Sequence, residues 1–147
     1  MMRKPQFFTL EELLRSSTAL NKKIENLPSW DVIEHLNELA LFLDGIRLAW
    51  GKPIYVSSAF RCKALNSVLP SSSPTSVHQI GYGVDMYVAG GKSEMDRFGR
   101  FLADYLKDKK YDQLLTEKSS SGGYWYHLGL YNNKGEQRRQ NKTMFVK

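Results

Sequence analysis

The segment Ser76-Val-His78-Gln-Ile-Gly81-Tyr-Gly83-Val-Asp85 carries a histidine and an aspartate on either side of two glycines, and Trp125-Tyr-His127 adds a second histidine. Two imidazoles and one carboxylate are a normal protein ligand set for a catalytic zinc ion, which keeps its fourth coordination position for water. The two glycines allow the backbone to turn tightly between the first histidine and the aspartate. Taken alone, three dispersed residues of these types are more often surface histidines and an aspartate at the end of a strand.

The side chains around Asp85 and His127 alternate in polarity, as they do in β-strands. Asp85 lies between Val84 and Met86, and His127 is likewise flanked by apolar residues, so each faces away from the apolar side of its strand. If these two strands are neighbours, both side chains converge on the open face of one sheet. His78 then reaches them from the loop before Asp85.

Helix and strand signals continue along the rest of the chain. Thr9-Leu-Glu-Glu12 matches a capping box, and Ser29 is the expected N-cap of the longest helix, which ends at Gly51-Lys-Pro53. Residues 70–76 have the turn-rich composition of a surface loop. The sequence predicts further helices over residues 10–15, 63–68 and 93–107, and strands over residues 54–58, 83–88, 111–118, 124–130 and 144–146.

The order of these elements predicts an α+β fold with a mainly antiparallel sheet, helices packed on one face and a zinc site on the other. No internal repeat or boundary interrupts residues 1–147, which we expect to form a single domain. The apolar fraction of 41% and the charged fraction of 24% are typical of soluble globular proteins. Cys62 is the only cysteine, which excludes an intrachain disulfide and a metal centre built from several thiolates.

Neither a targeting segment nor a membrane span is expected. Arg3 and Lys4 are not followed by an apolar run long enough for the core of a signal peptide. The chain also lacks a run of about 18 uncharged apolar residues, the length that a membrane-spanning helix needs. We therefore expect synthesis in the cytoplasm without a signal peptide.

The combination Ser76-x-His78-x-x-Gly81-x-Gly83-x-Asp85 with Trp125-x-His127 resembles the zinc D-alanyl-D-alanine carboxypeptidase family, which includes phage endolysin peptidases and the D,D-dipeptidases of vancomycin resistance. The family pattern has alanine where this chain has Gly83, a difference of one methyl group. The resemblance extends over nearly the whole chain, because three further segments also match the family: Phe8-Thr-Leu-Glu-Glu12, Val56-Ser-Ser-Ala-Phe-Arg61 and Tyr111-Asp-Gln-Leu-Leu-Thr-Glu117.

The resemblance implies that His78, Asp85 and His127 hold one Zn²⁺ per chain. A zinc ion polarises a scissile carbonyl and acidifies water, which permits amide hydrolysis without a covalent intermediate. The third histidine of the chain, His35, matches no motif, and we interpret it as structural or solvated.

Glu117 is the candidate general base, because hydrolysis needs a carboxylate that takes a proton from water and returns it to the leaving amine. If residues 119–123 form a hairpin connection, Glu117 lies nearly opposite the segment from Trp125 to His127, although a slip of one residue would turn it to the other face. Several family members carry the catalytic carboxylate three residues before the last histidine, where this chain has Tyr124. An ordinary surface glutamate is therefore the alternative interpretation.

Arg61, Ser76 and Trp125 are the candidates for substrate binding, and Tyr82 is a further aromatic residue to weigh beside Trp125. The planar donor fork of Arg61 suits a substrate carboxylate or carbonyl, although a structural arginine is the alternative. Ser76 can donate to the substrate or simply cap its loop. Trp125 and Tyr82 are aromatic residues that can line the cleft or merely pack beside it.

The resemblance implies a partner, the stem peptide of peptidoglycan, and an enzyme acting as a D-Ala-D-Ala carboxypeptidase or an L-Ala-D-Glu type endopeptidase. By analogy we expect a phage or prophage lysis enzyme, a monomer that reaches the cell wall after release from the cytoplasm; a bacterial housekeeping enzyme exported by another route is the other origin. The alternative is a non-catalytic, zinc-containing binding or structural module of a wall or virion.

The net charge of +6 also raises the question of a polyanionic partner. Residues 131–147 hold five basic residues against the single Glu136, a patch that suits nucleic acid, acidic lipid or anionic wall polymers, or is simply solvated. We expect no nucleic-acid partner, because that function leaves the His-Asp-His pattern unexplained and the tail has few aromatic residues for stacking.

Overall fold

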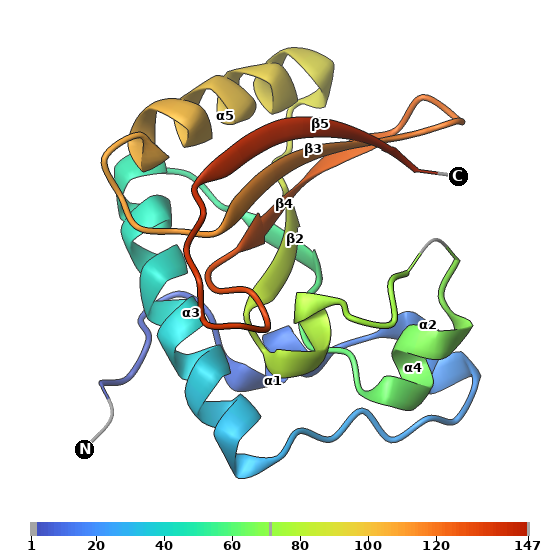
Figure 1. The fold of residues 1–147 in the computed structure, drawn as a ribbon. Helices are drawn as coiled ribbons and strands as arrows, with labels where there is room; N and C mark the ends of the chain where they lie inside the picture. Colours follow the sequence, from blue (N-terminus) through green and yellow to red (C-terminus); the bar gives the residue numbers. More distant parts are fainter. Residues whose placement is uncertain (1–2, 71, 147) are drawn as a thin grey trace.

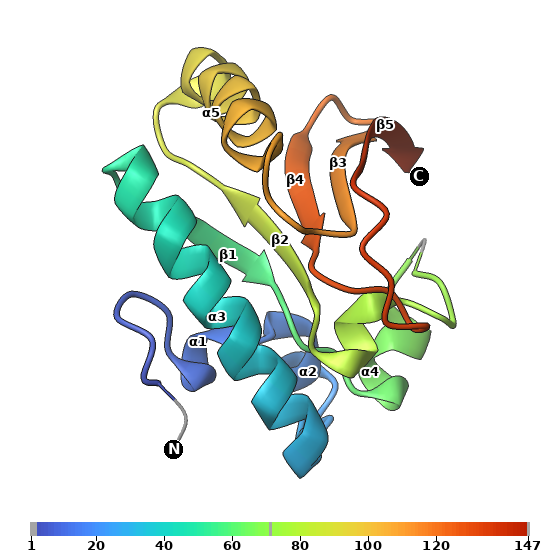
Figure 2. The same ribbon diagram turned by 60° about the vertical axis from the view of Figure 1, so that its left-hand side comes forward.

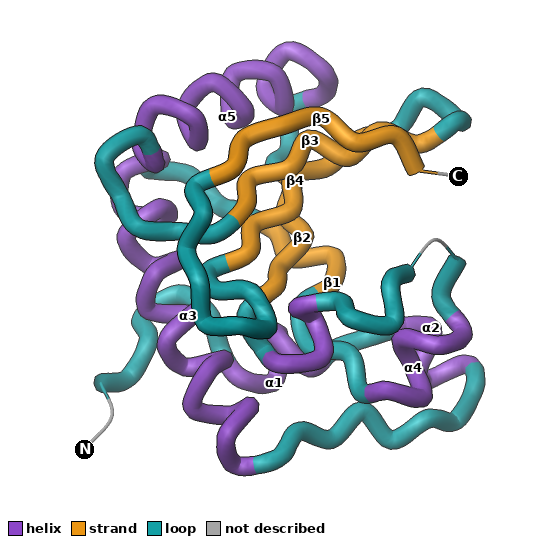
Figure 3. Tube along the Cα trace, in the orientation of Figure 1, coloured by secondary structure: helices purple, strands orange, loops and turns teal. Residues whose placement is uncertain are grey.

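A single five-stranded sheet with strand order β1-β2-β4-β3-β5 organises the chain (Figures 1 and 3). The structure, a computed structural model, describes residues 3–70 and 72–146. All neighbouring strands are antiparallel except β3 and β5, which are parallel. The strands are β1 (Tyr55–Ser58), β2 (Gly83–Tyr87), β3 (Gln113–Ser119), β4 (Tyr124–Gly129) and β5 (Gln140–Val146).

Most of the helices begin where the sequence predicts. Thr9 and Ser29 act as N-caps, since their side-chain oxygens accept hydrogen bonds from backbone N–H groups three residues on. The longest helix ends at Gly51, which adopts the left-handed conformation with φ of 80°. The helices are α1 (Leu10–Leu14), α2 (Ser17–Asn21), α3 (Trp30–Trp50), α4 (Lys63–Val68) and α5 (Gly91–Leu106), with one 3₁₀ turn, η1 (Val77–Ile80).

Two elements were not predicted from the sequence. The helix α2 is only five residues long and depends on a local cap, in which the Ser16 side chain accepts from the Ala19 N–H. The turn η1 follows the predicted loop at residues 70–76, which carries no helix or strand in its described residues, 70 and 72–76. Both elements are too short to produce a periodic apolar pattern.

The helices α3 and α5 cover one face of the sheet and form the core with it (Figure 2). The apolar residues Val84 and Met86 of β2 and Leu128 of β4 are fully buried beneath these helices. Burial of such side chains stabilises a fold by about 1.5–3 kcal/mol each. The predicted α+β fold, with helices on one face, is therefore confirmed. Within the described residues, no helix has the length and apolar composition needed to cross a membrane.

An ion pair between the buried Asp112 and the partly exposed Arg138 fixes the chain between β4 and β5. The carboxylate of Asp112, which is 1% exposed, accepts hydrogen bonds from the backbone N–H, Nε and Nη2 of Arg138. The Gln140 N–H then donates to the Asp112 carbonyl, where the parallel pairing of β5 with β3 begins. This strand is longer than the predicted strand over residues 144–146, because β-pairing to β3 rather than apolar alternation determines it.

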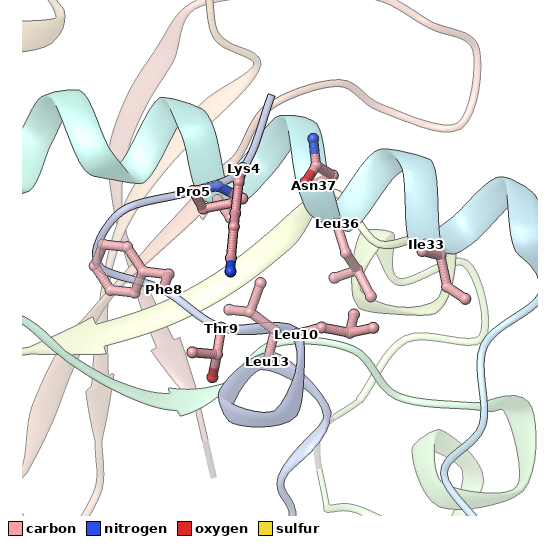
Figure 4. A pocket seen from close by; sticks show the side chains of 10 residues that line it. Lys4, Pro5, Phe8, Thr9, Leu10, Leu13, Ile33, Leu36 and Asn37 are labelled. Atoms are coloured by element: carbon pink, nitrogen blue, oxygen red, sulfur yellow. The ribbon is translucent and has the colours of Figure 1, made fainter. Parts of the chain in front are cut away.

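The N-terminal segment lies over α3 and encloses an apolar pocket of about 300 Å³ (Figure 4). The carboxylate of Asp44 on α3 accepts the backbone N–H groups of Gln6 and Phe7, and the Asn37 side chain donates to the Arg3 carbonyl. The pocket is lined by Lys4, Pro5, Phe8, Thr9, Leu10, Leu13, Ile33, Leu36, Asn37 and Ala40.

We predict that Asp112→Asn lowers the free energy of unfolding at neutral pH by about 1–3 kcal/mol, because it weakens hydrogen bonds to a charged acceptor. Burial raises the pKa of Asp112, but the hydrogen bonds and charge of Arg138 outweigh it, so the pKa lies below its ordinary value. The stabilisation is thus present above the unfolded pKa, near 4, and is lost as pH falls through the folded value.

Chemical denaturation at several pH values measures this effect. The difference between wild type and Asp112→Asn should narrow below about pH 4. Asp108→Asn is the matched control, since Asp108 is exposed and pairs only with its neighbour Lys109. Equal effects of the two substitutions would contradict the prediction.

Candidate metal centre

Asp85 and His127 lie directly opposite each other on the neighbouring strands β2 and β4. The residues next to them in β2 and β4, Val84, Met86 and Leu128, point into the core, so both polar side chains face the other side of the sheet. The distance between His127 Nδ1 and Asp85 Oδ1 is 2.9 Å. The convergence predicted from alternation is confirmed.

His78 reaches the same point from the turn η1. The turn begins at Ser76, whose hydroxyl oxygen accepts the His78 N–H, and ends at Gly81 in the left-handed conformation. His78 Nε2 lies 3.3 Å from Asp85 Oδ1. His78 was expected on a loop before Asp85. Residues Val77–Ile80 form instead a short 3₁₀ turn, which directs the His78 imidazole toward β2.

The three side chains fit a metal ion. One nitrogen from each of His78 and His127 and one oxygen from Asp85 all lie within 4.8 Å of one another, and all three residues are buried. Two imidazole nitrogens and a carboxylate oxygen are ligands that zinc accepts in a catalytic site with three protein ligands. The residues present thus match the donor set of such a site.

Hydrogen bonding and burial hold His78 and Asp85 in the protonation states that metal binding needs. His78 Nδ1 lies 2.6 Å from the Ala59 carbonyl oxygen, so Nδ1 carries the proton and Nε2 presents its lone pair to the cluster. Burial lowers the pKa of His78, which keeps the imidazole neutral. Burial raises the pKa of Asp85, but His78 and His127 lower it further, so this carboxylate is ionised.

Arg61 holds the outer oxygen of Asp85. Its Nη2 donates to Asp85 Oδ2 at 3.2 Å, its Nε donates to the Ser58 hydroxyl, and its backbone N–H donates to the His78 carbonyl. The Arg61 side chain is 14% exposed and that of Asp85 9%, so the ion pair is largely shielded from water. Arg61 therefore orients the carboxylate that lies between the two histidines.

Glu117 lies on the same face, on β3, which pairs with β4 on the side away from β2. It is opposite Trp125 in the β3–β4 register, and its Oε1 is 3.8 Å from His127 Nδ1. Burial and the Asp85 carboxylate raise the pKa of Glu117 above its ordinary value, against smaller opposing effects of His127 and Arg61. The predicted hairpin register thus brings a carboxylate of increased basicity to the cluster.

Comparison with known proteins identifies the family. A family model described as Peptidase M15 matches residues 6–121. The chain belongs to the peptidase M15 family. This family consists of zinc-dependent peptidases, which agrees with the His-Asp-His cluster. A search of curated proteins finds no match. The match includes His78 and Asp85 but ends before β4, so the case for His127 in this M15 peptidase depends on its geometry.

Three further residues of the M15 peptidase, Ser76, Trp125 and Tyr82, were considered as substrate contacts, and each makes different contacts in the structure. The Ser76 hydroxyl caps η1, which is the structural alternative weighed for it. Trp125 shares the face of the cluster, and its indole Nε1 is buried without a hydrogen-bond partner among the described residues. Tyr82 packs rather than lines the cleft, the second of its two interpretations: its ring stacks on His35 at 4.2 Å, and its hydroxyl donates to Glu38 on α3.

Two features of the M15 peptidase site were not recognised from the sequence. The Ala59 carbonyl fixes the tautomer of His78, but a backbone group leaves no signal in a side-chain pattern. Gly83 lies so close to the cluster that a Cβ there would be 2.9 Å from Val77 Cγ2 and 3.3 Å from His127 Cε1. A methyl group at this position would therefore require the Val77 side chain to shift.

We predict that the M15 peptidase binds one zinc ion per chain and that His78→Ala, Asp85→Asn and His127→Ala each abolish stoichiometric binding. Removal of one ligand from a set of three leaves the ion poorly held. Elemental analysis of the dialysed proteins gives the stoichiometry. Zinc should also stabilise wild type by about 2.7 kcal/mol at a free concentration of 100 Kd.

His35→Gln is the matched control for this experiment, because His35 is the only histidine outside the cluster. Its ring contacts the Ile80 carbonyl and the Tyr82 ring instead. This variant should retain one zinc ion per chain. Full zinc content in any of the three ligand variants would exclude that residue as a ligand.

Proposed function

We propose that this zinc metallopeptidase hydrolyses an amide bond in the stem peptide of peptidoglycan. The observation that carries the proposal is the convergence of two imidazoles, one ionised carboxylate and a second, more basic carboxylate on the open face of one sheet. His78 would bind zinc through Nε2, His127 through Nδ1 and Asp85 through its carboxylate. The sequence resemblance to D-alanyl-D-alanine carboxypeptidases supports the choice of peptidoglycan as the substrate.

The division of labour within the site follows from its charges. When bound, zinc supplies a Lewis acid that polarises the scissile carbonyl and acidifies water. Glu117 accepts the proton of the attacking water and returns it to the leaving nitrogen as the C–N bond breaks. Its raised pKa suits both steps, since a group that first accepts and then donates a proton works best with a pKa near the working pH.

Arg61, Ser76 and Trp125 are the proposed substrate contacts. Nε and Nη2 of Arg61 bind Ser58 and Asp85, while Nη1 has no hydrogen-bond partner among the described residues. That remaining donor suits a carbonyl or carboxylate oxygen of the stem peptide. The Ser76 hydroxyl still has its proton to donate, and the Trp125 indole extends the site along β4.

The net charge of +6 suits an enzyme that works on a wall rich in anionic polymers. We propose that it does so as a phage or prophage lysis enzyme, made in the cytoplasm and released to the wall. A wall-binding module without turnover is the alternative that the activity measurement must exclude.

The decisive measurement is the release of new amino groups from purified peptidoglycan. Wild type should release them, chelation should abolish the release, and added zinc should restore it. Glu117→Gln should lower kcat by roughly 10²–10⁴-fold, the usual contribution of general acid–base catalysis, while retaining its zinc. Identification of the newly exposed terminus distinguishes the D-Ala-D-Ala bond from the L-Ala-D-Glu bond.

Glu34→Gln is a suitable control, because Glu34 lies on α3 at the helical face of the sheet and removal of its charge should leave activity unchanged. Full activity in Glu117→Gln would assign the base to another group. A zinc-loaded wild type that releases nothing from any wall type would favour the binding module.

A further inference from the structure

Two exposed tyrosines form a stacked pair at one end of the sheet. Tyr55 of β1 and Tyr87 of β2 are Cα partners, and their ring centroids lie 5.4 Å apart with an interplanar angle of 28°. Each residue is 42% exposed, although aromatic rings in this protein are otherwise used mainly to fill the core. The pair thus offers a broad aromatic surface to the solvent.

This pair lies on the face that carries the metal cluster. Tyr87 follows Asp85 by two residues in β2, so both side chains point to the same side, about 7 Å apart along the strand. The β2–β4 register, continued by one step from Met86 and Tyr126, sets Trp125 beside Tyr87. The aromatic row therefore runs across the sheet immediately next to the row that contains Asp85 and His127.

A pyranose ring has the chemistry that this surface fits. One face of the sugar presents C–H groups, and its edge carries hydroxyl and amide groups. A tyrosine offers a flat apolar ring with a polar hydroxyl at its tip, and such amphipathic rings are suited to a partner that remains partly hydrated. Cross-strand stacking of two tyrosines also stabilises a sheet. That structural role needs no ligand, and it does not explain why the pair lies beside the His-Asp-His cluster.

We infer that Tyr55 and Tyr87 form a saccharide subsite that binds a sugar ring of the glycan strand while the attached stem peptide occupies the cleft. This inference rests on the proposed function. Because the stem peptide is covalently joined to the glycan, a bound sugar anchors the peptide and raises its effective concentration at the cluster. The enzyme therefore prefers stem peptides that still carry their sugar.

The test compares two soluble substrates, a disaccharide stem peptide and the same peptide without the sugar. Wild type should show the higher kcat/KM on the sugar-bearing substrate. Tyr55→Ala and Tyr87→Ala should each reduce the ratio of the two kcat/KM values by about tenfold, as expected for loss of one aromatic contact. Trp30→Ala is the matched control, because Trp30 is also an exposed aromatic residue but begins α3 on the helical side.

Thermal unfolding and zinc content establish that each variant is folded, and Tyr87→Thr supplies a β-branched strand residue should Tyr87→Ala unfold. A purely structural role for the pair would lower both kcat/KM values together and leave their ratio unchanged, which overturns the inference. A wild type that cleaves both substrates equally well also overturns it.

A binding measurement separates this inference from the proposed function. Titration with an N-acetylglucosamine tetramer should shift the NMR signals of the Tyr55 and Tyr87 ring protons, whether or not the protein cleaves a peptide. If wild type cleaves neither substrate but these signals shift, the proposed function fails and the saccharide subsite stands. Unshifted signals at millimolar tetramer overturn the subsite.

Discussion

The buried carboxylate of Asp85 is the constraint on which the site depends. A carboxylate removed from water is costly unless it is paired and hydrogen-bonded. Here its partners come from three separate segments: His78 from η1, His127 from β4 and Arg61 from the connection between β1 and α4. Each segment must therefore be in position before the charge is compensated, so correct folding and assembly of the site are one event.

The two faces of the sheet have different roles, one in stability and the other in the proposed chemistry. Its helical face carries the large apolar core with α3 and α5, while the opposite face collects charged and polar groups within a few ångströms of one another. Such a collection of like and opposite charges is poorly suited to stabilise a fold by itself. Successive residues of a strand point to opposite faces of the sheet. A side chain of β2 or β4 therefore belongs either to the core or to the polar cluster, depending on whether its position in the strand is odd or even.

Much of this arrangement could be predicted because it follows from local rules. Alternation around Asp85 and His127 predicted which face of the sheet both side chains occupy, and the expected hairpin after Glu117 predicted its position opposite Trp125. The parallel strand β5 could not be predicted in full, because its exposed and mixed residues carry no alternation and its register depends on Asp112 far away in the sequence. The choice between packing and cleft lining for Tyr82 stayed open for a related reason, since its partners lie on the distant helix α3.

The close fit around Gly83 couples the choice of side chain at positions 77 and 83. The room that a methyl group at position 83 would need is already filled by Val77 Cγ2, at 2.9 Å from the ideal Cβ. Alanine at position 83 would therefore require the Val77 side chain to move in this backbone. A smaller residue at position 77 would leave room for that methyl group, so the side chains tolerated at the two positions depend on each other.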